Sequence, residues 1–413
     1  MTDGAYSAAE SRALRLLPDR GGPLQVAGLF AGIGGIEQGM HEAGHRSVLL
    51  CEVMEEAKTV LRARFPGVPL IPDVNDLRPE DIAEADVVTA GFPCQDLSQA
   101  GRTEGIRGEQ SGLIQRVFAL LEKLEDPPKW LVLENVTFML HLDRGEGMRY
   151  LARSLRKLGY RWAYRVVDTR AFGLPQRRQR VILVASKHDD LDPRGVLFVD
   201  EKEPRPDPDF RRVACGFYWT EGLRGLGWAV DAVPTLKGGS TIGIPSPPAI
   251  WMPERELTIV KPGIRDAERL QGFPAGWTKA AGEGGTRRSK NARWKLVGNA
   301  VSVPVAEWLG RRLAVPGDYD NARTSQSLHG RHKWPKAAWG DASGTFEVEI
   351  SIWPERRRYK HLRNFLGKDL EPLSARATAG FYERAKRGNL NFDKIPGFLD
   401  AVERHRDMML ERG

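Results

Sequence analysis

The stretch QVAGLFAGIGG, residues 25–35, decides the fold class of this chain. Val26–Phe30 is a short apolar run of strand length, and the glycine turn after it leads into a helical pattern that ends near Ala43. A strand, a glycine turn and a helix in this order place the turn at the carboxyl edge of a sheet, where the backbone can approach a ligand. The stretch therefore predicts a nucleoside pocket; a tight turn without a ligand is the alternative.

The same alternation of strand and helix patterns continues as far as Ser186. Strands are predicted at Ser47–Cys51, Asp86–Ala90, Trp130–Val136, Tyr164–Val167 and Val181–Ala185, and helices at Glu55–Phe65, Leu113–Leu124 and Met148–Leu158. Strands that alternate with helices of this length are typical of an α/β fold with a doubly wound, mostly parallel sheet.

Changes in composition mark the expected domain boundaries. Residues 1–22 form a short N-terminal arm, and residues 23–186 form the α/β domain, which residues 285–315 complete. Residues 187–284, rich in Pro, Gly, Arg and Asp over much of their length, form a smaller, loop-rich domain. Residues 316–413 are a C-terminal extension of unassigned role.

The extension opens with an aromatic and basic segment that includes Trp334 and Trp339. Tryptophan next to lysine fits contact with a nucleic acid, but tryptophan is more often buried. We therefore expect both rings to pack in a core.

The overall composition is that of a globular protein with a basic surplus. Of 413 residues, 41% are hydrophobic and 28% are charged, and the formal net charge is +8. No run approaches the ~20 apolar residues of a membrane-spanning helix, and no apolar signal segment begins the chain. Positive charge permits a polyanionic partner without demonstrating one. We expect a cytoplasmic protein with no membrane partner.

The three cysteines are too few for a disulfide framework, and none lies in a CxxC pair. These residues are Cys51, Cys94 and Cys215. A reduced, intracellular protein without a metal site is therefore expected.

Acidic residues near the glycine turn point to a nucleoside rather than to a nicotinamide dinucleotide. The dinucleotide fingerprint needs a third glycine where this chain has Glu37. Glu52 ends the second predicted strand, twenty residues after Gly32, where a carboxylate can accept both ribose hydroxyls. Asp73, on a further short strand expected between the helix Glu55–Phe65 and the strand Asp86–Ala90, could then face an adenine amino group.

Three reactive side-chain types follow other strands toward the same edge. Cys94 comes after the strand Asp86–Ala90, Glu134 ends the next strand, and Arg178 and Arg180 precede the last one. Each has an ordinary interpretation, namely a buried thiol, a solvated carboxylate and a basic turn. Together they predict a thiol, a carboxylate and guanidinium groups beside the nucleoside pocket.

These motifs, in this order, resemble those of the cytosine-C5 DNA methyltransferases. The resemblance covers roughly residues 24–187 and 255–315, and it includes the segments Glu268–Pro274 and Gly298–Pro304. It assigns catalytic roles to Cys94 in Pro-Cys-Gln, Glu134 in Glu-Asn-Val, and Arg178 and Arg180 in Gln-x-Arg-x-Arg.

The resemblance implies S-adenosyl-L-methionine as the cofactor and the fold of the methyltransferases that use it. The expected cofactor-binding residues are Phe30, Gly32, Ile33, Gly34, Gly35, Glu52, Val53, Asp73, Val74, Gly91, Pro93, Leu113, Asn299 and Val301. Two positions depart from the family pattern. Gly28 stands where the first strand usually carries Asp, and Val53-Met54 stands where an aromatic often stacks on adenine.

The resemblance also implies a mechanism and a partner. The target cytosine is flipped out of double-stranded DNA, the Cys94 thiolate attacks carbon 6, and carbon 5 receives the methyl group. Residues 187–284 become the target-recognition domain, and a restriction endonuclease or another defence-system protein becomes a candidate partner. The expected DNA-binding residues are Gln95, Ser98, Arg102, Arg107, Thr235, Leu236 and Lys237.

Two other functions share these motifs. One branch of the family methylates tRNA, and a catalytically silent relative could bind DNA alone. The length of the segment 187–255 favours a DNA-reading domain, and the presence of Cys94, Glu134 and both arginines favours an enzyme.

Overall fold

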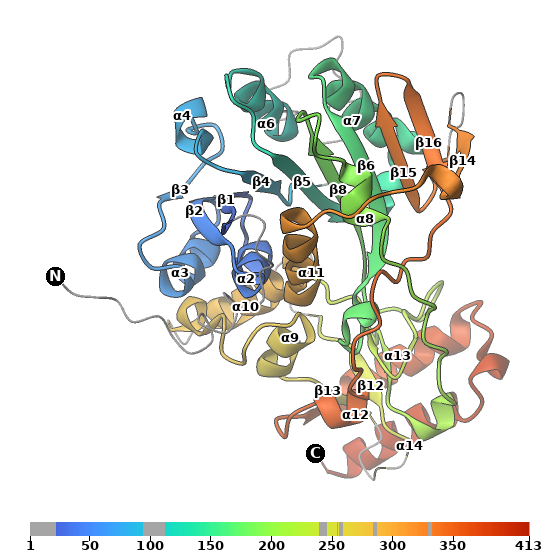
Figure 1. Ribbon diagram of the computed structural model, residues 1–413. Coiled ribbons are helices and arrows are strands. Elements are labelled where there is room, and N and C mark those ends of the chain that lie inside the picture. Colours follow the sequence, from blue (N-terminus) through green and yellow to red (C-terminus); the bar gives the residue numbers. More distant parts are fainter. Residues whose placement is uncertain are drawn as a thin grey trace. The chain divides into compact units, whose positions relative to one another are not determined.

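The computed structural model describes residues 22–93, 112–238, 246–253, 255, 259–283, 287–328 and 333–412. These residues form two compact units, each drawn from several parts of the sequence (Figure 1). Unit 1 comprises the chain as far as Asp168 together with Gln179–Pro204 and Val301–Glu355. Unit 2 comprises Thr169–Arg178, Arg205–Ala300 and the chain from Arg356 onward.

Unit 1 is built on one ten-stranded sheet with the order β14-β16-β15-β6-β8-β5-β4-β1-β2-β3. The strands are β1 (Gln25–Leu29), β2 (Arg46–Cys51), β3 (Leu70–Ile71), β4 (Val87–Ala90), β5 (Trp130–Val136), β6 (Arg161–Asp168), β8 (Gln179–Ser186), β14 (Thr324–Ser327), β15 (Ala337–Asp341) and β16 (Gly344–Val348). The strands from β3 to β5 pair in parallel, and the remaining pairs are antiparallel. The predicted α/β class is confirmed.

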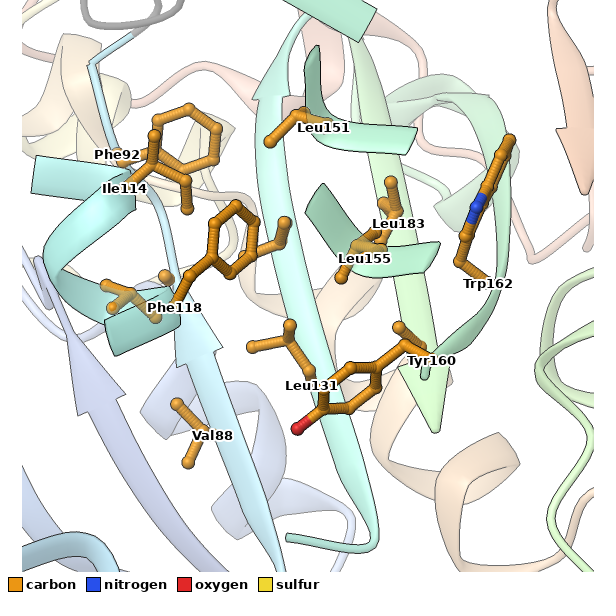
Figure 2. Packing of buried hydrophobic residues seen from close by; sticks show 14 of the residues in the cluster. Val88, Phe92, Ile114, Phe118, Leu131, Leu151, Leu155, Tyr160, Trp162 and Leu183 are labelled. Carbon is orange, nitrogen blue, oxygen red and sulfur yellow. The ribbon is translucent and has the colours of Figure 1, made fainter. Parts of the chain in front are cut away.

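The helices of unit 1 cover both faces of this sheet (Figure 1). They are α2 (Gly35–Glu42), α3 (Glu55–Arg64), α4 (Pro79–Ile82), α6 (Leu113–Glu122), α7 (Glu146–Lys157), α8 (Pro193–Leu197) and α11 (Val303–Ala314). Figure 2 shows the core on one face, where α6 and α7 place Phe118 and Leu151 over Leu131 and Leu183. Each such side chain contributes about 1.5–3 kcal/mol when it is fully buried.

On the other face, α2 packs closely on α11. A Cβ on Gly39 would lie 2.4 Å from the Cβ of Ala306, and one on Gly35 would lie 2.4 Å from the carbonyl oxygen of Val301. Only glycine allows this approach without a shift of the backbone. The segment after Val301 therefore returns to the glycine turn at the start of α2.

The C-terminal extension does not form a unit of its own, which corrects the expected boundaries. Its first part adds β14–β16 to the sheet of unit 1, where β15 pairs with β6. Trp334 is buried and donates its indole N–H to the carbonyl of Gly145. Trp339 stacks on Phe346 with ring centroids 4.6 Å apart. Both rings therefore pack against the protein, as expected.

Unit 2 holds a five-stranded sheet with the order β10-β9-β12-β13-β17 and a separate pair, β7 and β11. The strands are β7 (Gln176–Arg177), β9 (Cys215–Phe217), β10 (Ala229–Val230), β11 (Val233–Pro234), β12 (Ala249–Trp251), β13 (Ile259–Lys261) and β17 (Glu371–Pro372). The helices are α9 (Ile264–Leu270), α10 (Arg287–Asn299), α12 (Leu362–Phe365), α13 (Ala375–Arg387) and α14 (Phe398–Glu411). Aromatic rings form the core, with Phe217 packed on Phe381 and Phe398.

The boundaries of the loop-rich domain also differ from those expected. Residues 187–204 belong to unit 1, because buried Arg165 of β6 donates hydrogen bonds to the carbonyls of Leu197 and Asp200. Helix α10 belongs to unit 2, so only the stretch from Val301 onward completes the α/β unit. Among the described residues, no helix has the length and apolarity needed to cross a membrane.

Candidate active site

The glycine turn between β1 and α2 is held in a conformation that favours glycine. Gly32 and Gly34 have φ values of 58° and 81°, and Phe30 reaches φ 56°. At Gly34 a Cβ would also lie 2.3 Å from the Phe65 ring. The turn closes through a hydrogen bond from the Gly34 N–H to the Ala31 carbonyl at 2.9 Å. The sequence FAGIGG thus presents open backbone at the carboxyl end of β1, as expected for ligand approach.

Glu52, directly after β2, is tied to this turn by its carboxylate. One carboxylate oxygen accepts the Gly32 N–H at 2.8 Å, and the other accepts the Met54 N–H at 2.8 Å. The side chain is 8% exposed. Because each carboxylate oxygen can accept two hydrogen bonds, both keep acceptor capacity for ligand hydroxyls.

The other residues expected around an adenine occupy different environments. Asp73 accepts the Asn75 N–H at 2.8 Å and is partly exposed. Val53 is 66% exposed, so its side chain is available to a ligand. Ile33 and Val74 are almost fully buried, so only their backbone groups could contact a cofactor. Leu113, the first residue of α6, is partly exposed and packs against the core.

Glu134 and Arg180 form an ion pair at the same edge of the sheet. Glu134 is near the end of β5, Arg180 is near the start of the antiparallel β8, and their Oε1 and Nε atoms are 2.9 Å apart. Both side chains are about one-tenth exposed, at 10% and 11%. Burial lowers the pKa of the Arg180 guanidinium, and the Glu134 carboxylate opposes that shift. The pair therefore supplies a fixed acceptor and a fixed donor at this edge of the sheet.

The ends of β1, β4 and β5 converge beside this pair. A Cβ on Gly91 would lie 3.8 Å from Oε2 of Glu134 and 3.9 Å from the Phe30 carbonyl oxygen. The Asn135 side chain donates to the Phe92 carbonyl at 3.0 Å and so fixes the chain that leaves β4. The glycine turn, Glu52, Gly91 and Glu134 thus gather within unit 1, with exposed Pro93 next along the chain.

Five residues predicted for catalysis or DNA contact lie outside the described residues. They are Cys94, Gln95, Ser98, Arg102 and Arg107. Among the described residues, no group of three or more His, Cys, Asp or Glu side chains is placed to hold a metal ion.

Arg178 has surroundings different from those of Arg180. Its buried guanidinium donates to the backbone carbonyls of Leu236, Gly298 and Ala300, at 3.2, 3.2 and 2.6 Å. All these residues belong to unit 2. The guanidinium therefore joins two distant segments of that unit, which sequence reasoning did not predict because two arginines in Gln-x-Arg-x-Arg look equivalent.

The Thr-Leu pair predicted to contact DNA is anchored by backbone and side-chain bonds. Thr235 donates its hydroxyl to the Arg177 carbonyl at 2.8 Å, and Leu236 is 2% exposed. Lys237 is half exposed, pairs with Glu221 and lies 3.9 Å over the Tyr218 ring. Of the three, Lys237 has the most accessible functional group. Asn299 also belongs to unit 2, where its side chain lies against Gly238.

A small pocket in unit 2 brings three arginines together. Arg212, Arg255 and Arg363 line it, along with apolar side chains such as Met252. These arginines were not among the predicted site residues, because none of them lies in a recognisable motif and Arg363 lies in the C-terminal extension. Three guanidinium groups around one hollow form a site suited to an anion.

Comparison with known proteins identifies the family of this chain. The sequence model of the C-5 cytosine-specific DNA methylases matches residues 24–212. The chain is 47% identical over 401 residues to the Type II methyltransferase M2.BsuMI of Bacillus subtilis, covering 94% of this chain and 100% of that protein. It is 30% identical over 302 residues to the Type II methyltransferase M.NgoBI of Neisseria gonorrhoeae, covering 68% of this chain and 89% of that protein.

Solved structures share the fold at low sequence identity. The S. pombe Dnmt2 methyltransferase superposes with a TM-score of 0.54 at 16% identity, over 70% of this chain and 98% of that one. The Entamoeba histolytica methyltransferase EhMeth gives a TM-score of 0.51 at 15% identity, over 71% of this chain and 98% of that one. The near-complete match to M2.BsuMI carries the assignment: this chain belongs to the C-5 cytosine-specific DNA methylases and is a DNA cytosine-5 methyltransferase.

Proposed function

We propose that this enzyme methylates carbon 5 of a cytosine within a short sequence of double-stranded DNA, as the methylating member of a restriction-modification system. The observation that carries the chemistry is the Glu134–Arg180 ion pair beside Gly91, at the edge that also holds the glycine turn and Glu52. Its relatives named Type II methyltransferases support the restriction-modification context.

The residues at the edge of unit 1 fit S-adenosyl-L-methionine. Glu52 keeps acceptor capacity for the ribose hydroxyls, exposed Val53 offers an apolar contact for the adenine, and Asp73 can accept from the adenine amino group. When bound, the cofactor supplies an electrophilic methyl group. The turn around Gly32 and Gly34 offers backbone groups to its amino-acid end.

Cys94 acts as the nucleophile in this proposal. Its thiolate forms a bond to carbon 6 of cytosine, and the displaced ring electrons make carbon 5 nucleophilic. Carbon 5 then takes the methyl group, after which loss of its proton and release of the thiolate restore the aromatic ring. Asn135 serves as a positioning residue, since its bond to Phe92 fixes the backbone two residues before Cys94.

Glu134 and Arg180 hold the base during this reaction. The Glu134 carboxyl group is suited to the exocyclic amine and ring nitrogen 3, and the Arg180 guanidinium is suited to the ring carbonyl. Their mutual ion pair fixes both in place before the base arrives. Arg178, whose guanidinium is bonded to three carbonyls of unit 2, acts instead as a positioning residue.

The target base must leave the duplex to reach these groups, since carbon 6 is inaccessible in stacked DNA. We assign sequence reading to unit 2, where Lys237 and the pocket of Arg212, Arg255 and Arg363 provide cationic groups. The pocket is suited to a backbone phosphate, which positions a protein on DNA without specifying sequence.

Covalent trapping tests this function. A DNA duplex that carries 5-fluorocytosine at the target blocks release of the enzyme, because fluorine replaces the proton that must leave carbon 5. Bisulfite sequencing of plasmid DNA from expressing cells first identifies the target sequence. We expect an adduct of wild-type enzyme with the fluorinated duplex in the presence of S-adenosyl-L-methionine, and none with Cys94→Ser. An adduct formed only with tRNA that carries 5-fluorocytosine would establish the RNA alternative.

A further inference from the structure

A carboxyl group from helix α2 fills the space that strand β1 leaves empty at Gly28. A Cβ built on Gly28 would lie 2.1 Å from Oε1 of Glu37 and 2.9 Å from its carboxyl carbon. Any side chain at position 28 would therefore occupy the place now taken by the Glu37 carboxyl group. The glycine in the strand and the glutamate in the helix form one structural pair.

This carboxyl group is buried and has no hydrogen-bond partner in any other described residue. Glu37 is 1% exposed, and neither of its carboxyl oxygens is hydrogen-bonded to another described residue. The hydroxyl of Thr89, likewise buried, also lacks a partner in the described part of the chain. Gly28 and Thr89 are register partners in the adjacent parallel strands β1 and β4. Two unsatisfied polar groups therefore lie on the same face of the sheet.

The position of this pair relates it to the proposed cofactor site. Thr89 precedes Gly91 by two residues, and Leu50, the register partner of Gly28 in β2, precedes Glu52 by two residues. Residues two apart in a strand point to the same face and are about 7 Å apart. The Glu37 carboxyl group thus lies one residue layer behind Glu52 and Gly91, under the glycine turn.

A buried carboxyl group without partners is costly when ionised, so it either holds a proton or faces a cation. Burial and, to a smaller extent, the negative charge of Glu52 raise the pKa of Glu37 to about 7, although a hydrogen bond from its own backbone N–H favours the charged form. The acidic residue of α11, Glu307, is paired with Arg311. Near neutral pH a small favourable charge would therefore be enough to ionise Glu37.

We propose that Glu37 is the counter-charge for the cationic amino-acid end of the cofactor, and that it releases a proton when the cofactor binds. The inference rests on the proposed use of S-adenosyl-L-methionine. That molecule carries two positive groups, an ammonium and a sulfonium. In a low-dielectric interior a carboxylate attracts such charges over several ångströms, so direct contact is unnecessary. Glu37 acts as a positioning and affinity residue outside the methyl-transfer chemistry.

Calorimetric titration tests the proposal through proton release. S-adenosyl-L-methionine is titrated into the full-length enzyme at pH 6.0 and 7.5, in buffers of different ionisation enthalpy. We expect release of close to one proton at pH 6.0, less at pH 7.5, and a dissociation constant about eight-fold weaker at the lower pH. The Glu37→Gln variant should release none and lose this pH dependence. Glu42→Gln, on the exposed side of the same helix, is the matched control and should behave as wild type.

S-adenosylhomocysteine distinguishes the two positive groups, since it keeps the ammonium and lacks the sulfonium. Equal proton release with both ligands identifies the ammonium, whereas release with S-adenosyl-L-methionine alone identifies the sulfonium. Binding without proton release, or equal release from Glu37→Gln, would overturn the role of Glu37 alone. If neither S-adenosyl-L-methionine nor S-adenosylhomocysteine bound, the result would overturn the proposed cofactor and, with it, this role of Glu37.

A reciprocal exchange provides a second test that a merely structural residue would fail. The double variant Gly28→Asp/Glu37→Ala returns the carboxyl group to the strand at the same place. We expect Glu37→Ala alone to weaken cofactor binding at least ten-fold at pH 7.5, and the double variant to recover most of that loss together with proton release. A double variant that folds, binds as poorly as Glu37→Ala and releases no proton would contradict the proposal.

Discussion

Oε1 of Glu134 lies 2.9 Å from Nε of Arg180 across the antiparallel pair β5 and β8, with both side chains about nine-tenths buried. The pairing fixes the direction of two groups that the proposed reaction needs side by side along one edge of the base. Because the ion pair exists before any base enters, neither group has to be reoriented during the reaction, which is the condition for electrostatic preorganisation.

Glu134→Gln should therefore lower methyl transfer strongly while leaving cofactor binding nearly unchanged. The amide can still accept a hydrogen bond, but it cannot protonate or counter the charge that develops on the ring. We expect turnover to fall by roughly 10²–10⁴-fold, measured with radiolabelled S-adenosyl-L-methionine. Glu146→Gln, which breaks the exposed pair with Arg149, should change turnover little. Near wild-type turnover of Glu134→Gln would remove this residue from the mechanism.

Substitution of Cys94 separates binding from chemistry. Cys94→Ser should retain the fold, the affinity for DNA and the affinity for cofactor, because the change removes only the soft nucleophile. Methyl transfer should become undetectable, whereas gel-shift affinity stays within about two-fold of wild type. Substantial turnover by the serine variant would contradict covalent catalysis through residue 94.

Glu52→Ala should weaken S-adenosyl-L-methionine binding by roughly 1–3 kcal/mol, which is the cost of unpaired polar groups at a buried site. Two effects contribute to the loss. The ribose loses its acceptor, and the amides of Gly32 and Met54 lose the carboxylate that holds the turn. Calorimetry measures the change directly. Equal affinity in the variant and the wild type would place the ribose elsewhere.

Much of unit 1 follows from its sequence because its signals are local. The runs around Val88, Leu131 and Leu183 are apolar over a strand length and are bounded by helical patterns, so the positions of these strands along the chain could be predicted. The glycine turn and Glu52 could be paired because a twenty-residue spacing fits one β-α-β unit.

The remaining features depend on contacts between residues far apart in the chain. Strand β15 joins the sheet through β6, at a separation that no local pattern encodes. Arg178 and Arg180 differ by two residues, yet one holds the carbonyls of unit 2 and the other pairs with Glu134. In the sequence, Glu37 indicates only that the third glycine of the dinucleotide fingerprint is absent. Its contact with the Gly28 position follows from the packing of α2 on the sheet.

The pH dependence of unfolding should report the same buried carboxyl group in the cofactor-free enzyme. Since the folded state raises the pKa of Glu37 from 4.5 to about 7, the folded state binds the proton more tightly than the unfolded state. Stability from this group is thus fully present below pH 4.5 and is lost as the pH rises through 7. Relative to wild type, Glu37→Gln should gain stability with rising pH, by up to about 3 kcal/mol near pH 8. Denaturant unfolding at pH 5 and 8 measures the difference in the free energy of unfolding between the two proteins, and a difference that does not depend on pH would contradict the prediction.

Substitutions in the arginine pocket of unit 2 should separate DNA affinity from sequence choice. Arg255 and Arg363 line a hollow with Arg212, and a phosphate held there would bind with the same strength whatever the base sequence. Arg255→Ala and Arg363→Ala should each weaken binding to target and non-target duplexes by the same factor, and each should reduce the salt dependence of binding by about one phosphate contact. The methylated sequence found by bisulfite sequencing should not change.

Exchange of the segment 187–255 for that of a relative with another target should instead move the methylated site, because base-reading contacts discriminate by about 1–3 kcal/mol each. A shift of the target site in the Arg363→Ala variant would mean that the C-terminal extension itself reads bases, and an unchanged site after the exchange would exclude 187–255 as the reading segment.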